Sequence, residues 1–202
     1  MDPGFRRDDE EGCIMDAIAA ITQRASPLKL GEPGPSAAEI KTLLEAAIRA
    51  PDHGKLKPWR FLVIEGAARQ RLGDLWVEGL RRREPEAQEV MFQREREKPL
   101  RAPVIVVVIA RVDRQHPKIP AVEQIVSAGS AAQNLQLAAH ALGYGCLWRT
   151  GAAAYDPVVK QGLGVPPEDE IIGFMYVGTI DTAGPLRPLA VEDFAAPWPA
   201  AG

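Results

Sequence analysis

The stretch from Ser127 to Gly151, SAGSAAQNLQLAAHALGYGCLWRTG, contains the features that decide the fold. It includes most of a predicted helix, Glu123 to Leu142, built mainly from Ala, Ser and Gly with a few leucines. A helix that is small or apolar on nearly every side has to be buried. In a chain of 202 residues, this predicts a central helix shared with a partner subunit. Gly143 and Gly145 end the helix, and Cys146 to Arg149 form a short extended segment.

Three apolar runs predict strands that pack against this helix. Val104 to Ala110 reads VIVVVIA, which is β-branched and continuous and is typical of a strand buried on both faces. Phe61 to Glu65 and Ile171 to Val177 are the other two runs, and each is followed directly by a glycine.

Three further helices are predicted, one from its apolar spacing and two from residues that cap a helix start. Met15 to Gln23 has apolar residues three to four apart, which places them on one face. Ser36 and Glu39 form a capping box that opens a helix running up to Pro51. Asp156, followed directly by a proline, predicts the start of a short helix near the C-terminal strand.

Residues 67–98 are charged and helical in tendency. Their charges alternate in sign, which predicts a solvated helix face or a lid rather than a binding patch. Trp76, Met91 and Phe92 are the apolar residues expected to dock this segment.

Composition excludes several classes of protein. Hydrophobic residues make up 46% of the chain and charged residues 25%, which excludes a fibrous or fully disordered protein. The net charge of −3, from 24 basic and 27 acidic residues, argues against a nucleic-acid binder. The longest aliphatic run has seven residues and is too short to span a bilayer. Cys13 and Cys146 cannot form a disulfide framework or a zinc site, so we expect a reducing cytoplasm.

The two ends of the chain differ from its middle. Residues 1–14 are charged and without apolar periodicity, so we expect a disordered extension, with Met15 as an alternative start. Residues 15–202 are expected to form one domain. Its last part, beyond Thr182, is rich in proline and is expected to run extended across a surface.

Polar residues follow three of the predicted helices. Arginine at the end of an element can form a forked contact with phosphate, and serine adds a hydroxyl donor. By spacing alone, the same residues could simply be solvated helix ends. No glycine-rich phosphate loop, zinc-protease motif or serine nucleophile motif occurs, and three scattered histidines make a protein-only metal site improbable. The polar residues are Arg24 and Ser26, then Arg49, Asp52 and His53, then Trp148, Arg149 and Thr150.

Three blocks of sequence in order resemble the nitroreductase family of flavoproteins, in particular its YdjA-like subgroup. They are RAPDHGKLKPWRFLVIEG from Arg49, SAGSAAQNLQLAAHALGYGCLWRTG from Ser127, and IIGFMYVGT from Ile171. The resemblance covers residues 15–178. It implies an α+β fold with a central, mostly antiparallel sheet flanked by helices. It also implies an intertwined homodimer with two FMN molecules at the subunit interface and a C-terminal tail over the partner.

The resemblance also implies roles for particular positions. The element Arg24, Ala25 and Ser26 is expected to hold the phosphate and ribityl groups of FMN. Arg49 and His53 match flavin-contacting positions that can come from the opposite chain. Residues 148–150 (Trp148, Arg149 and Thr150) match the segment that lines the flavin, and residues 138–143 match a region that meets the nicotinamide cofactor.

The sequence departs from the wider family in two places. The turn before Pro58 and Trp59 lacks the usual asparagine and glutamine, so Lys55 or Lys57 is expected to supply a donor to the flavin instead. The late phosphate clamp is absent unless Arg187 serves, which predicts modest FMN affinity.

The implied activity is an FMN-dependent NAD(P)H oxidoreductase that reduces nitroaromatics or quinones by ping-pong hydride transfer through flavin N5. No protein residue is expected to act as a catalytic acid. Arg24 or Arg149 is expected to stabilise the reduced flavin. Two alternatives remain open: a related flavoprotein with other chemistry on the same scaffold, and a non-catalytic flavin-binding protein. The sequence leaves open the acceptor and the choice between NADH and NADPH.

Overall fold

A computed structural model describes residues 15–198 of the chain. The helices are α1 (Ala17–Gln23), α2 (Ala37–Ala47), α3 (Ala68–Arg83), α4 (Glu89–Glu97), α5 (Ala121–Ala141), α6 (Ala152–Tyr155) and α7 (Pro157–Gly162). The strands are β1 (Lys29–Gly31), β2 (Trp59–Glu65), β3 (Val104–Ala110), β4 (Gly145–Arg149) and β5 (Glu170–Thr182). Short 3₁₀ turns are η1 (His53–Lys55), η2 (Lys98–Arg101) and η3 (Val191–Asp193).

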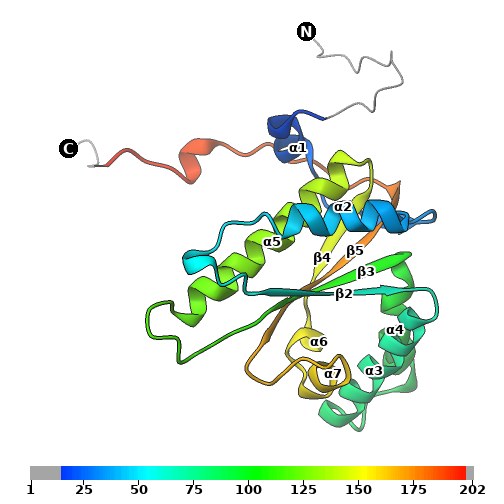
Figure 1. Cartoon of the computed structure of the whole chain (residues 1–202). Helices are drawn as coiled ribbons and strands as arrows, with labels where there is room; N and C mark the ends of the chain where they lie inside the picture. Colours follow the sequence, from blue (N-terminus) through cyan, green and yellow to red (C-terminus); the bar gives the residue numbers. More distant parts are fainter. Residues whose placement is uncertain (1–14, 199–202) are drawn as a thin grey trace.

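The five strands form one antiparallel sheet. β3 lies between β2 and β5, while β4 and β1 also pair with β5. This is the α+β fold with a mostly antiparallel central sheet that the sequence predicts. Helices cover both faces, with α2 and α5 on one side and α3, α4, α6 and α7 on the other (Figure 1).

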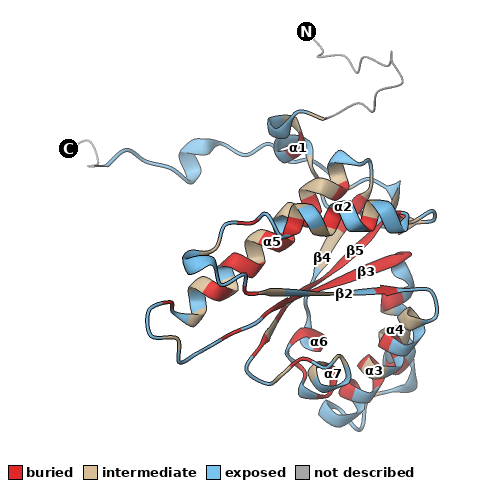
Figure 2. Cartoon of the chain, viewed as in Figure 1, coloured by how far each residue is buried: buried red, intermediate tan, exposed pale blue. Residues whose placement is uncertain are grey.

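The alternation of side chains along β3 explains why this strand is apolar throughout. Ile105, Val107 and Ile109 point into the core under α3 and α6, where the rings of Trp76 and Phe174 meet edge to face at 4.9 Å. The other side chains of β3 point into the core under α2 and α5. Both faces of β3 are therefore covered by apolar side chains, and every residue of β3 is buried (Figure 2).

The helix start signals are confirmed. Ser36 and Glu39 cap α2 reciprocally, with the Ser36 N–H donating to Glu39 Oε2 at 2.7 Å. Asp156 accepts from the Val158 N–H at 2.8 Å at the start of α7. β2 extends further than its apolar run indicates because pairing with β3 continues through Trp59 and Arg60. β5 extends further because its end, beyond Val177, pairs with β4 and β1.

The charged segment forms α3 and α4, and its docking differs in one residue from the prediction. Trp76 and Phe92 are buried, as expected, but Met91 is exposed and is not a docking residue. Met91 directly precedes Phe92 on α4, and adjacent residues of a helix point in different directions.

The ends of the chain contrast with this core. The predicted disorder of residues 1–14 lies outside the described residues. After β5 the chain runs as a tail, residues 183–198, that passes α1 and leaves the sheet (Figure 1). Its large apolar residues are mostly exposed: they are Leu186, Leu189, Val191, Phe194 and Trp198. No helix among residues 15–198 is long and apolar enough to cross a membrane.

Candidate functional site

The side chains of β4 separate onto the two faces of the sheet. Trp148 packs with the α2 and α5 core, and its indole N–H donates to the Ile172 carbonyl at 3.0 Å. A Cβ at Gly173 would lie 2.2 Å from that indole nitrogen, so only glycine leaves room for the ring. Leu147 and Arg149 point to the opposite face. Trp148 is the first residue of the predicted segment 148–150, and its side chain is therefore part of the core.

On that opposite face lies a cavity of about 610 Å³, here called the Arg149 pocket. A volume of this size is typical of small-molecule sites. Five segments far apart in sequence form its walls: the chain directly after Ser26, α3 through Trp76, the end of α4 with η2, the chain from the end of β4 into α6, and β5 through Tyr176. Its lining residues are Pro27, Leu28, Lys29, Leu30, Trp76, Glu95, Lys98, Leu100, Arg101, Leu147, Arg149, Thr150, Gly151, Ala152, Ala153 and Tyr176.

Four cationic side chains line the Arg149 pocket. Lys29 is paired with Asp181, and Lys98 is paired with Glu95. Arg101 and Arg149 have no hydrogen-bonded or ion-paired partner on their side chains within residues 15–198. The pocket therefore offers two free guanidinium groups to a ligand that carries or develops negative charge.

Tyr176 lies in the wall of this pocket. Burial raises the pKa of its hydroxyl, and the nearby Arg101 and Arg149 charges only partly oppose that shift. The hydroxyl therefore stays protonated at neutral pH and can donate a hydrogen bond.

Arg24 lies at the end of α1 and is half-buried. Its Nη1 atom is buried and has no hydrogen-bond partner among the described residues. Its charge also acts on His140 of α5 and on Cys146 of β4, where burial raises the pKa of the thiol to about 12. A buried guanidinium nitrogen without an acceptor fits the phosphate of an anionic ligand. Ala25 and Ser26 lead from Arg24 directly into the wall of the Arg149 pocket.

Arg49 and His53 lie elsewhere, at the end of α2 and in η1. Both are exposed, and His53 Nδ1 lies 2.5 Å from Glu123 Oε2 at the start of α5. His53 lines a separate hollow of about 340 Å³ with Asp52, Val122, Val126, Ser127 and others, here called the His53 corner. α2 and α5 cover the face of the sheet opposite to α3 and α4, so this corner is separate from the Arg149 pocket within one chain. One protomer does not bring all the predicted residues together.

The turn beside this corner holds the two lysines singled out from the sequence. Lys55 and Lys57 have φ of 58° and 49°, in the left-handed region that favours glycine. The Asp52 carboxylate accepts from the Lys57 N–H at 2.8 Å and thereby holds the turn. Both side chains are exposed at this side of the molecule, away from the Arg149 pocket.

Sequence reasoning missed Lys29, Glu95, Lys98, Arg101 and Tyr176. Tyr176 looks like one more residue of a buried strand, and the charged residues look like a solvated surface. The run REREKPLR contains one usable signal: Pro99 marks the end of α4, and the short turn η2 between α4 and β3 begins there. Two arginines without partners become visible only once the fold is known.

The fold is that of an α+β protein with a cationic pocket beside an antiparallel sheet. The family model described as Nitroreductase family matches residues 21–179. The chain belongs to the nitroreductase family, which confirms the resemblance and makes the protein an oxidoreductase.

Relatives and solved structures agree with this assignment. The chain is 39% identical over 165 residues to "Putative NAD(P)H nitroreductase YdjA" of Escherichia coli, covering 82% of this chain and 88% of that protein. It is 36% identical over 172 residues to a "Putative NAD(P)H nitroreductase" of Haemophilus influenzae, covering 82% and 89%.

Among solved structures, a nitroreductase-like family protein from Bacillus cereus has a TM-score of 0.75 at 24% identity, over 91% of this chain and 97% of that one. A "putative nitroreductase in complex with FMN" from Desulfovibrio desulfuricans has a TM-score of 0.66 at 26% identity, over 91% and 98%. The FMN in the second structure agrees with the cofactor that the sequence predicts.

Proposed function

We propose that this chain is an FMN-dependent NAD(P)H oxidoreductase that reduces nitroaromatic or quinone acceptors. The observation that carries the proposal is the Arg149 pocket, in which two unpaired arginines face a cavity of about 610 Å³. The names of the relatives support a nicotinamide donor and FMN.

The residues present fit FMN. The buried Nη1 of Arg24 lacks an acceptor that a phosphate group would supply, and the Ser26 hydroxyl follows two residues later. The apolar side chains of Leu28 and Leu147 line the pocket beyond it and suit a flat ring. FMN, when bound, supplies the redox chemistry, because it can exchange a hydride with a nicotinamide and pass electrons to an acceptor.

Arg149 and Arg101 perform the electrostatic part of the reaction. Preorganised positive charge stabilises negative charge that develops on a ligand during reduction, and it needs no rearrangement at that moment. Tyr176 adds a neutral donor from the same wall. Glu95 is paired with Lys98, so no free acid of the pocket is assigned a proton-transfer role and solvent protonates the product.

The site is proposed to be completed by a second copy of the chain. Arg49 and His53 lie apart from the Arg149 pocket, and the neighbouring Val122 and Val126 on α5 are 63% and 62% exposed. The tail adds Phe194 and Trp198, which are 74% and 96% exposed. Such apolar surface is typical of an interface, and a homodimer would cover it. Arg49 and His53 of each chain would then contact the flavin held mainly by the other.

One pocket that serves a nicotinamide donor and an acceptor in turn predicts ping-pong kinetics. The acceptor class, the choice of NADH or NADPH and a location in the cytoplasm stay predictions.

The absorbance spectrum of the purified protein tests the proposal. We expect a yellow dimer with flavin bands that are bleached by NADH or NADPH and restored by a nitroaromatic or a quinone. Arg24→Ala and Arg49→Ala should each lower FMN retention, while Arg82→Ala, an exposed arginine of α3, should not. A colourless protein that cannot be loaded with FMN would contradict the proposal. A loaded protein that is not reduced by either nicotinamide would favour a flavin-binding protein without this activity.

A further inference from the structure

Two buried nitrogen atoms without partners lie in the region where α1 packs against α5, close enough for the charge of one residue to act on the other. One is Arg24 Nη1, and the other is Nε2 of His140 in the last turn of α5. Neither atom has a hydrogen-bond partner among residues 15–198. Most buried polar side-chain atoms are paired, so two unpaired nitrogens in one place indicate a missing acceptor.

The surroundings of His140 favour its neutral form in the protein without a ligand. Burial lowers the pKa of its imidazole, and the neighbouring Arg24 charge lowers it further. Cys146 of β4, which is also beside Arg24, carries a thiol that stays protonated and gives no negative charge. On α2, the Glu39 carboxylate accepts from Ser36 and from the Tyr144 hydroxyl at 3.1 Å and is not a partner of His140. The buried residues of β3 and β5 against α5 are aliphatic or sulfur-containing side chains.

We propose that Arg24 and His140 together bind the phosphate group of FMN, and that His140 takes up a proton when the phosphate binds. The inference rests on the proposed function, since it assumes that FMN is the ligand. A phosphate provides acceptor oxygens for both nitrogens. Its negative charge also offsets the two effects that lower the pKa of His140, so the charged imidazolium becomes more favourable in the complex.

This arrangement makes FMN binding depend on pH in a defined direction. The pKa of His140 is low in the free protein and rises in the complex, so the contribution of His140 is present at low pH and is lost as pH rises through the higher pKa. The phosphate's own second ionisation, with a pKa of about 6, acts in the opposite direction. A comparison of variants at each pH removes that effect, because it is common to all of them.

Quenching of flavin fluorescence measures the affinity directly and needs no turnover. We expect His140→Gln to bind FMN about tenfold more weakly than the wild type at pH 5.5 and within about twofold at pH 8.5, as for the loss of one charge-assisted hydrogen bond. Riboflavin lacks the phosphate, so its affinity should not differ between the two proteins at either pH. His116→Gln, a loop histidine, is the matched control and should behave as the wild type.

Imidazole NMR of the wild-type protein gives a second readout that does not depend on the folding of His140→Gln. The chain has only three histidines, so His53→Gln and His116→Gln identify the third signal by elimination. The His140 pKa should rise when FMN is added and should not move with riboflavin. FMN bound with an unchanged His140 pKa would overturn this inference alone. A rise with NADPH but not with FMN would overturn it as well, and a failure to bind FMN at all would contradict the proposed function.

Discussion

The Arg149 pocket and the His53 corner contain residues of the same predicted site, yet the structure builds them in opposite ways. The Arg149 pocket is closed on several sides by one chain, and its free arginines are held by β4 and η2. The His53 corner is shallow and exposed, and His53 is fixed only through Glu123. The Arg149 pocket can therefore bind a ligand in one protomer, whereas the His53 corner needs a surface from elsewhere.

The difference shows how the functional residues are distributed between the two faces of the sheet. β4 places Arg149 on the α3 and α4 face, while α2 and α5 carry the His53 corner on the other face (Figure 1). A second protomer related by symmetry could bring the corner of one chain to the pocket of the other. Four predictions test this division of labour.

Arg149→Ala has the largest expected effect. Removing a preorganised charge from the pocket should lower kcat/KM for a nitroaromatic by about a hundredfold. Arg149→Lys keeps the positive charge but not the forked guanidinium group, so its kcat/KM should fall less. Steady-state kinetics with the FMN-loaded protein measures both, with Arg82→Ala as control. Unchanged kinetics in Arg149→Ala would remove the pocket from the proposed site.

Mixing two impaired variants should restore part of the activity. If His53 serves the pocket of the partner, a hybrid of His53→Ala and Arg149→Ala chains has one intact site and one doubly defective site. Random pairing then restores about a quarter of the sites. Activity after joint refolding of the two variants measures this. No recovery, although mass spectrometry of the intact assemblies detects hybrids, would place His53 in the site of its own chain.

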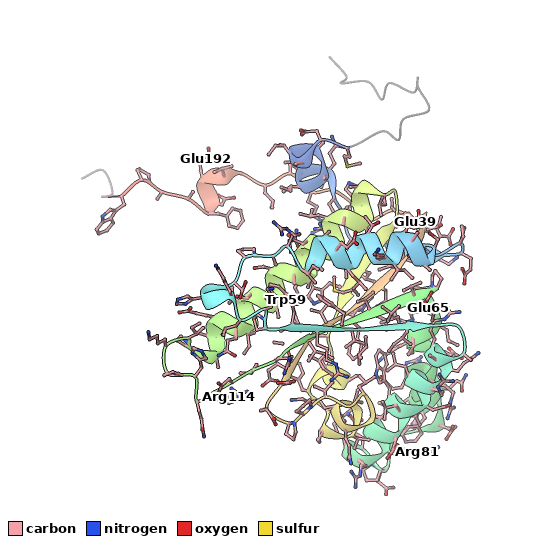
Figure 3. All side chains as sticks on the ribbon, viewed as in Figure 1. Glu39, Trp59, Glu65, Arg81, Arg114 and Glu192 are labelled. Carbon is pink, nitrogen blue, oxygen red and sulfur yellow. The ribbon has the colours of Figure 1, made fainter. Side chains whose placement is uncertain are left out.

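Polar substitutions in the tail should weaken the dimer more than they affect the fold. Phe194→Ser combined with Trp198→Ser removes two large aromatic side chains that are mostly exposed in the described chain. Buried aromatic residues are often the strongest contacts of an interface, so the dimer Kd should rise about tenfold or more. Sedimentation velocity over a dilution series measures it. Glu192→Gln on the same tail, labelled in Figure 3, is the control. An unchanged Kd in the double variant would exclude the tail from the interface.

Ser36→Ala has the smallest expected effect and acts on the helix that leads to Arg49. Loss of the cap should lower the free energy of unfolding by about 1 kcal/mol, which lowers Tm by about 2–4 °C. Ser36→Thr keeps a hydroxyl acceptor and should cost less. Urea and thermal unfolding measure both variants. Equal stability of Ser36→Ala and the wild type would show that α2 is held by its packing alone.

The sequence predicted the strands and helices that depend mainly on their own residues. The VIVVVIA run became β3, the capping box of Ser36 opened α2, and Asp156 opened α7. β1 was not predicted, because its three residues have no periodicity and it exists through pairing with the far end of β5. α6 is a single turn without a side-chain cap and gave no signal.

For the candidate site, the structure shows which of the predicted residues lie near one another, and the sequence did not give that arrangement. The sequence pointed to Arg24, Arg149 and Thr150, which lie in or next to the Arg149 pocket. It did not point to Lys98 and Arg101, since alternating charge does not reveal which side chains turn inward at the end of a helix. The separation of Arg49 and His53 from the pocket follows from which face each helix covers, and no short motif encodes that.

The burial of Cys146 has a chemical consequence for a catalyst of this kind. Its thiol lies beside Arg24 with a pKa of about 12, so almost no thiolate forms at physiological pH. Thiolate is the form that reacts with electrophiles, peroxides and disulfides. Electrophiles and oxidants would therefore meet no reactive sulfur at this position, so Cys146 is protected from alkylation and oxidation.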